Sequence, residues 1–180
     1  MFLPAGLTWD KPKNTETYPQ ASLVTYRFPA RENFPPLTLM WYDGGLMPPR
    51  PEELPDGQPM GDKFGGALYV GTKGKIVCGS HGANEVRIIP PEKMADYKQP
   101  PRTLPRSVGH RQEWLQACRG GEKAGSNFDF AGPLTETVLL GNIALRTDQK
   151  LHWDAEQFQF TNAQDANKLL HHDYREGWTL

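Results

Sequence analysis

The chain has 180 residues, which is long enough for one domain with its own hydrophobic core. Twenty Lys and Arg residues against 21 Asp and Glu residues give a net charge of −1, which argues against nucleic acid or an anionic membrane as partner. No apolar run approaches the roughly 18 residues of a membrane-spanning helix, so we expect a soluble protein. The first residues lack the pattern of a signal peptide, and both the cytoplasm and the bacterial periplasm stay open as locations.

The first half of the chain has the alternating and short apolar runs that are typical of strands. A long segment rich in proline and glycine, residues 44–66, interrupts these runs and has no periodic pattern. A glycine-rich turn between two of the runs predicts a hairpin. We predict five strands, over residues 21–28, 37–42, 67–70, 75–78 and 85–89.

The second half changes to helical periodicity. Ser107 is in position to cap a helix over residues 108–119, which Gly120-Gly121 ends. A second helix is expected to open at Pro133 and to be largely buried, with Gly141 marking close packing on a sheet. Two short strands over residues 151–154 and 157–161 and a last helix from Asn162 complete the prediction.

Strands followed by helices, joined by short links, predict an α+β fold in a single domain over residues 1–180. We expect an open-faced, predominantly antiparallel β-sheet with helices packed on one face. The opposite face would carry large aromatic residues and must meet water, another domain or another copy of the chain. The aromatic residues expected there are Tyr26, Trp41, Tyr42 and Tyr69.

Four residues are candidates for binding a substrate. Trp41 and Asp43 combine an aromatic ring with a carboxylate at a strand end, an arrangement that suits a sugar, although Asp43-Gly44 is also an ordinary turn sequence. Arg106 and His110 lie at the start of a predicted helix, where an anionic or hydroxyl-rich ligand is favoured, although a solvated first turn has the same sequence pattern.

Other constellations are weaker. Asp129 and Glu136 are a carboxylate pair that a glycoside hydrolase would need, but the positions equally fit a helix start stabilised by acidic groups. The five histidines show no metal-ligand spacing, and Cys78 and Cys118 fit free thiols better than a disulfide or a metal pair. The sequence therefore predicts no metal site.

Sequence signatures of nucleotide binding and of a serine nucleophile are both missing from the chain. There is no GxGxxG fingerprint of a dinucleotide-binding domain and no GxSxG nucleophile motif. We therefore assign no cofactor-binding and no catalytic residue to these 180 residues.

Several segments, in this order and spacing, resemble the C-terminal domain of the Gfo/Idh/MocA oxidoreductases, in the bacterial branch that includes glucose-fructose-oxidoreductase-like members. The resemblance covers nearly the whole chain from Tyr18. It rests on the segments TYPQASLVTYRFPAR, LTLMWYDGGLMPPRPEEL, GGALYVGTKGKI, RSVGHRQEWLQACRGG, FDFAGPLTETVLLGNIALR, KLHWD and YREGW.

The resemblance implies a partner for this chain. Such enzymes have an N-terminal Rossmann domain that binds NAD(P), and a C-terminal domain whose open sheet face commonly mediates oligomer formation. Their substrates are typically sugars or polyols. The family's EKP-type lysine motif and its helix with catalytic Asp and His are not found here, so NAD(P) is implied only for a parent protein with the Rossmann domain.

The resemblance thus predicts the substrate-pocket and assembly domain of an NAD(P)-dependent sugar or polyol oxidoreductase, inactive alone and homo-oligomeric through its sheet face. Two alternatives stay open. One is a stand-alone module that binds carbohydrate or another protein. The other is a glycoside hydrolase that uses Asp129 and Glu136.

Overall fold

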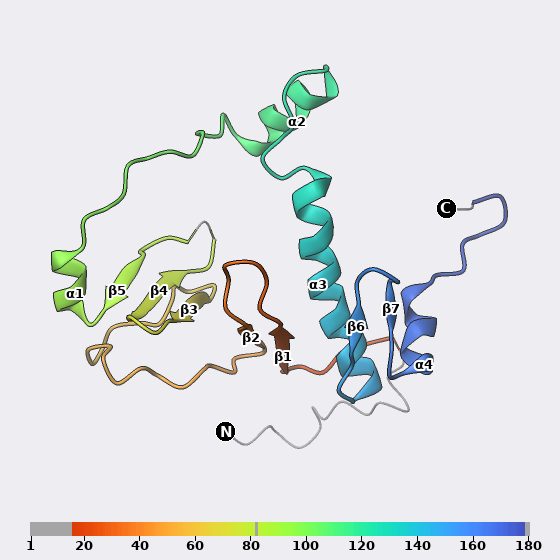
Figure 1. The fold of residues 1–180 in the computed structure, drawn as a ribbon, viewed down its shortest axis with the longest axis horizontal. Helices are drawn as coiled ribbons and strands as arrows, with labels where there is room; N and C mark the ends of the chain where they lie inside the picture. Colours follow the sequence, from red (N-terminus) through yellow and green to blue (C-terminus); the bar gives the residue numbers. More distant parts are fainter. Residues whose placement is uncertain (1–15, 82, 179–180) are drawn as a thin grey trace. The chain divides into compact units, whose positions relative to one another are not determined.

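The computed structural model describes residues 16–81 and 83–178 and divides the chain into two compact units. The first unit comprises Met1–Met47 and Ser107–Leu180, and the second comprises Pro48–Arg106. Figure 1 follows the chain through both units. The single domain over residues 1–180 stays a prediction, and each unit is described by itself below.

The first unit begins with a two-stranded antiparallel ribbon. Strand β1 (Leu23–Phe28) pairs with strand β2 (Leu37–Tyr42), so that Val24 lies opposite Trp41 and Tyr26 opposite Leu39. Because side chains alternate between the faces of a strand, these four residues share one face of the ribbon. Both predicted strands are confirmed.

The 20-residue helix α3 (Phe128–Thr147) packs against β1 at Gly141. A Cβ atom on Gly141 would collide with the Tyr26 hydroxyl group and lie 3.4 Å from Val24 Cγ1. Partial burial also raises the pKa of the Tyr26 phenol. The prediction that Gly141 marks close packing on a sheet is confirmed.

Two other expectations for α3 are wrong. The helix begins at Phe128 rather than Pro133, because the Asn127 side chain accepts a hydrogen bond of 3.0 Å from the Asp129 amide and caps an earlier turn. It is also not largely buried. Gly141 is its one buried residue, while Leu134 and Val138 are 55% and 48% exposed, since the packing partners lie along its second half.

The C-terminal part of the first unit forms a small core against the second half of α3. Phe160, Ala163 and Ala166 are buried there, and Leu140 and Ile143 of α3 pack on them. The surrounding elements are strands β6 (Trp153–Asp154) and β7 (Gln159–Phe160), helix α4 (Gln164–Asn167) and the 3-10 helix η1 (Lys168–Leu170). Figure 1 shows this hairpin and α4 beside the lower part of α3.

Asn162 does not start the last helix as predicted. Its Oδ1 atom accepts a hydrogen bond of 2.7 Å from the His152 amide, and α4 begins two residues later without a side-chain cap. Asn162 therefore connects the two sides of the β6–β7 hairpin instead of capping a helix.

Helix α2 (His110–Cys118) is shorter than predicted and carries no buried residue. The Ser107 hydroxyl accepts a hydrogen bond of 2.9 Å from the Gly109 amide, before the helix begins, so the capping role expected for Ser107 is wrong. The Ser107 hydroxyl and the Gly125 amide hold the pKa of Glu113 below its usual range. Trp114 in this helix is 63% exposed.

The second unit is a three-stranded antiparallel sheet in the order β3-β4-β5. Its strands are β3 (Gly66–Val70), β4 (Lys75–Gly79) and β5 (Arg87–Ile89), as the hairpin prediction required, and a short helix α1 (Pro91–Asp96) follows β5. Val77, Ile89 and Leu54 form the core of this unit. Leu54 comes from the long proline-rich segment, which therefore supplies part of the core.

The α+β class with antiparallel sheet is confirmed, and the described strands fall into three small antiparallel sheets. The expected grouping of aromatic residues on one open face is wrong. Trp41 and Tyr42 are neighbours in β2 and so point to opposite faces, and Tyr26 lies on the face that packs against α3.

Candidate functional site

Asp43, a predicted sugar-binding residue, follows β2 directly. Its Oδ1 atom accepts a hydrogen bond of 2.6 Å from the Ser22 amide, and its Oδ2 atom accepts one of 2.9 Å from the Ser22 hydroxyl. The Asp43 amide donates in turn to the Ser22 carbonyl oxygen at 3.1 Å. The carboxylate thus closes the end of the β1–β2 ribbon, and any ligand would share it with Ser22.

Trp41 stands two residues before Asp43 in β2, on the ribbon face that also carries Val24. Its side chain is 54% exposed. An exposed indole beside a carboxylate remains suitable for stacking on a sugar ring, and the structure brings Trp41 and Asp43 to the same end of the ribbon.

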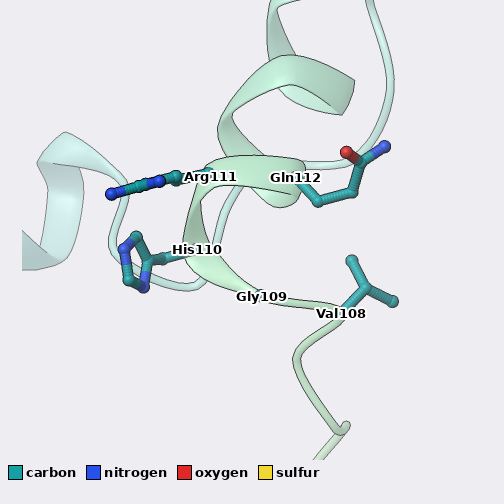
Figure 2. Close-up of a pocket in the computed structure, with 5 residues that line it drawn as sticks. All are labelled: Val108, Gly109, His110, Arg111 and Gln112. Atoms are coloured by element: carbon teal, nitrogen blue, oxygen red, sulfur yellow. The ribbon is translucent and has the colours of Figure 1, made fainter.

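His110 begins α2 and lines a depression with a volume of about 330 Å³. Its neighbours Val108, Gly109, Arg111 and Gln112 line the depression too. Figure 2 shows the imidazole of His110 and the guanidinium of Arg111 on the same side of the helix start, with Val108 and Gln112 on the other. All lining residues come from one consecutive segment, so the surface is a shallow depression. Imidazole and guanidinium nitrogens there can donate hydrogen bonds to hydroxyl or anionic oxygens.

Arg106 is exposed and is the last residue of the second compact unit. Trp41, Asp43 and His110 belong to the first unit. The grouping of Arg106 with these three residues therefore stays a prediction.

The carboxylate pair proposed for a hydrolase lies along α3. Asp129 is in the first turn and forms an exposed ion pair with Lys123 at 2.5 Å, while Glu136 lies two turns further on and accepts a hydrogen bond of 2.8 Å from Trp153 Nε1. Seven residues of helix separate them by about 10 Å along the axis. Each carboxylate therefore has a structural partner of its own.

The second unit contains a polar cluster that the sequence analysis did not find. Asp62 Oδ1 accepts hydrogen bonds from the Phe64 amide at 2.8 Å and from the Ser80 hydroxyl at 3.0 Å, and Asp62 Oδ2 accepts the Ser80 amide at 3.0 Å. Ser80 Oγ also lies 2.9 Å from His81 Nδ1. Asp62 is 18 residues away from Ser80 in the chain, so no local spacing signals this cluster.

The pKa of Asp62 is lowered, first of all by the hydrogen bond from the Phe64 amide. An ionised Asp62 can only accept hydrogen bonds. Close packing supports the arrangement, because a Cβ atom on Gly79 would lie 2.5 Å from Asp62 Oδ2.

Across residues 16–81 and 83–178, no group of three or more His, Cys, Asp or Glu side chains is arranged to hold a metal ion. Within the same ranges, no helix has the length and apolar character needed to cross a membrane.

A family model described as "Oxidoreductase family, C-terminal alpha/beta domain", of the Gfo/Idh/MocA oxidoreductases, matches residues 68–180 of this chain. The match runs from β3 to the end of the chain and covers more than half of it. The chain belongs to the Gfo/Idh/MocA oxidoreductase family. No curated protein matches it. The family resemblance inferred from the sequence segments is thus confirmed.

Gfo/Idh/MocA oxidoreductases commonly use NAD(P). A dinucleotide-binding domain needs parallel strands joined by crossover helices, with a glycine-rich turn at the first helix. Every strand pairing among the described residues is antiparallel. Residues 16–81 and 83–178 therefore do not fit a dinucleotide site of this kind.

Proposed function

We propose that this Gfo/Idh/MocA chain is the substrate-pocket and assembly domain of a bacterial NAD(P)-dependent sugar or polyol oxidoreductase. The family match over residues 68–180 carries the proposal. In the parent enzyme a hydride would pass between the nicotinamide and a carbinol carbon. A Rossmann domain outside these 180 residues would supply the nucleotide site and the catalytic groups.

The exposed side chains of the first unit support a role in assembly. Leu23 and Met40 lie on the ribbon face opposite Val24 and Tyr26 and are 47% and 48% exposed. On α3, Phe128 and Phe130 are 92% and 63% exposed. Exposed apolar side chains that adjoin one another on a strand pair or on one helix turn offer a surface for another domain or another copy of the chain.

As substrate-binding residues we propose Trp41, Asp43 and His110 of the first unit and, separately, Arg106 of the second. Trp41 would stack on the substrate ring. Arg106 and His110 would donate hydrogen bonds to its oxygen atoms. Asp43 would accept a hydroxyl hydrogen bond in addition to the two bonds that it accepts from Ser22.

Calorimetric titration of the 180-residue chain with NAD, NADH and NADPH tests this division of labour. We expect no binding heat for any of the three and no dehydrogenase turnover with sugars or polyols. Clear binding of any one nucleotide would contradict the proposal, because the nucleotide site would then lie within this chain.

A tryptophan fluorescence titration of the same chain with sugars separates this proposal from a stand-alone carbohydrate-binding module. Such a module would bind sugar tightly without any partner. We expect at most weak binding, since the domain would form one wall of a pocket. A Trp41→Ala variant serves as the control for signals that arise from the other four tryptophans.

A further inference from the structure

The Asp62–Ser80–His81 cluster fixes the position of the protons in the His81 ring. The Ser80 hydroxyl has a single hydrogen atom and two partner side chains: the Asp62 carboxylate, with Oδ1 at 3.0 Å and Oδ2 at 3.3 Å, and His81, with Nδ1 at 2.9 Å. An ionised carboxylate cannot donate a hydrogen bond, so the Ser80 hydrogen must point to Asp62. His81 Nδ1 must then carry a hydrogen atom and donate it to Ser80 Oγ.

The alternative arrangement is unfavourable. If the Ser80 hydroxyl donated to His81 Nδ1, its lone pairs would face the negatively charged oxygen of Asp62 at 3.0 Å. The lowered pKa of Asp62 keeps that carboxylate ionised at neutral pH, so this repulsion would be present under physiological conditions. The neutral His81 ring therefore has its hydrogen on Nδ1, and Nε2 is an unprotonated acceptor.

The His81 ring has a second neighbour in Phe64, and a further hydrogen bond holds the His81 backbone. The Phe64 ring meets it edge to face, with 5.3 Å between ring centroids, and Lys63 Nζ lies 4.8 Å from the centre of the Phe64 ring. Asn84 donates a hydrogen bond of 2.7 Å to the His81 carbonyl oxygen. His81 itself is exposed. A side chain with one defined tautomer, a fixed ring and an exposed position is preorganised for a ligand.

We propose that His81 is a ligand-binding residue whose Nε2 atom accepts a hydrogen bond from a hydroxyl group of a polyol or sugar. Asp62 and Ser80 are positioning residues, which act by holding the hydrogen atom on Nδ1. The choice of a hydroxyl-bearing ligand rests on the proposed function, whereas the tautomer rests on the geometry of the cluster alone.

Nitrogen-15 NMR of the histidine rings in the full chain tests the tautomer directly. We expect neutral His81 to show a protonated Nδ1 and an unprotonated Nε2. In Ser80→Ala and Asp62→Asn variants we expect this signature to shift toward the Nε2-protonated form. Ser107→Ala is the control, because it removes a serine hydroxyl whose partners are the Gly109 amide and the Glu113 carboxylate rather than a histidine ring.

A His81 ring protonated on Nε2 in the wild-type chain would overturn the proposal, as would an unchanged tautomer in both cluster variants. If either variant failed to fold, which its amide spectrum would reveal, the other variant and the wild-type spectrum would still decide the question.

Chemical modification tests the ligand. Diethyl pyrocarbonate reacts with an unprotonated imidazole nitrogen, and mass spectrometry of peptides reports the rate at each histidine. With D-glucose or myo-inositol at a concentration equal to the dissociation constant, we expect the rate at His81 to fall by about half. His152, which is exposed and lies in the other unit, is the internal control and should keep its rate.

Equal rates at His81 with and without both polyols would overturn the hydroxyl-binding role. The outcome is distinguishable from a failure of the proposed function. Nucleotide binding in the calorimeter would contradict the proposed function and leave the tautomer of His81 intact, while a wrong tautomer without nucleotide binding would remove this inference alone.

Discussion

Asp43 is the candidate residue whose surroundings are best defined in the structure. Its carboxylate accepts both the amide and the hydroxyl hydrogen atoms of Ser22, which is 7% exposed. The two residues are 21 positions apart, and their contact joins the end of β2 to the segment before β1. At the scale of a single residue, Asp43 therefore has a structural task that the sequence motif did not reveal.

An Asp43→Ala variant should be less stable than the wild-type chain. The change would leave the buried donors of Ser22 without their acceptors, at a cost of about 1–3 kcal/mol. Urea denaturation measures the loss as a lower midpoint. Asp56→Ala is the control, since Asp56 is exposed and such a change usually alters the free energy of unfolding by less than about 0.5 kcal/mol. Equal midpoints for the two variants would show that the Ser22 contact contributes nothing.

At the scale of elements, α3 divides into two halves with different environments. Its second half packs on β1 and on the small core around Phe160, while its first half carries exposed apolar side chains. Its apolar spacing predicted a buried helix, but periodicity identifies an apolar face without identifying what covers it. Gly141 is the point of closest approach, where the absence of a side chain leaves room for Tyr26.

Gly141→Ala should destabilise the chain despite the better helix propensity of alanine. The propensity gain of about 1 kcal/mol is opposed by the overlap of the new Cβ with Tyr26, and overpacking of this kind costs about 1–3 kcal/mol. Gly132→Ala in the same helix is the matched control, because a Cβ atom there meets no atom within 4 Å.

For Gly132→Ala we expect a midpoint equal to or above that of the wild-type chain, since the following Pro133 offsets part of the propensity gain. Thermal or urea denaturation of both variants provides the comparison. A Gly141→Ala chain that is as stable as the Gly132→Ala chain would mean that Tyr26 moves aside at no cost.

The elements that the sequence predicted well are those that local chemistry determines. The residues of β2 and the hairpin around Gly71 and Gly74 follow from short apolar runs and turn residues. Two features were missed because they depend on residues that are separated in the sequence. The Asn162 side chain accepts a hydrogen bond from the His152 amide instead of capping α4. The Asp62 carboxylate accepts a hydrogen bond from the Ser80 hydroxyl, 18 residues further along the chain. Neither pairing leaves a pattern of spacing that could be recognised in the sequence.

At the scale of the whole molecule, the assembly proposal depends on the open face of the β1–β2 ribbon. Leu23 and Met40 lie on that face, and each exposes about half of its side chain. A stable interface between protein copies buries about 800 Å² on each partner, and apolar side chains at its centre contribute most of the affinity. A charge placed at the centre of such a surface would have to be buried without a partner on association.

Met40→Lys should therefore convert an oligomeric chain to the monomer, as measured by light scattering. Lysine keeps the long unbranched side chain of methionine, so the strand can retain its pairing, which circular dichroism would verify. Leu104→Lys is the matched control, because Leu104 is 82% exposed and lies in the connection outside the strands. We expect the control to keep the oligomeric state of the wild-type chain. A wild-type chain that is already monomeric, or a Met40→Lys chain that still assembles, would show that this face of the ribbon is not where copies meet.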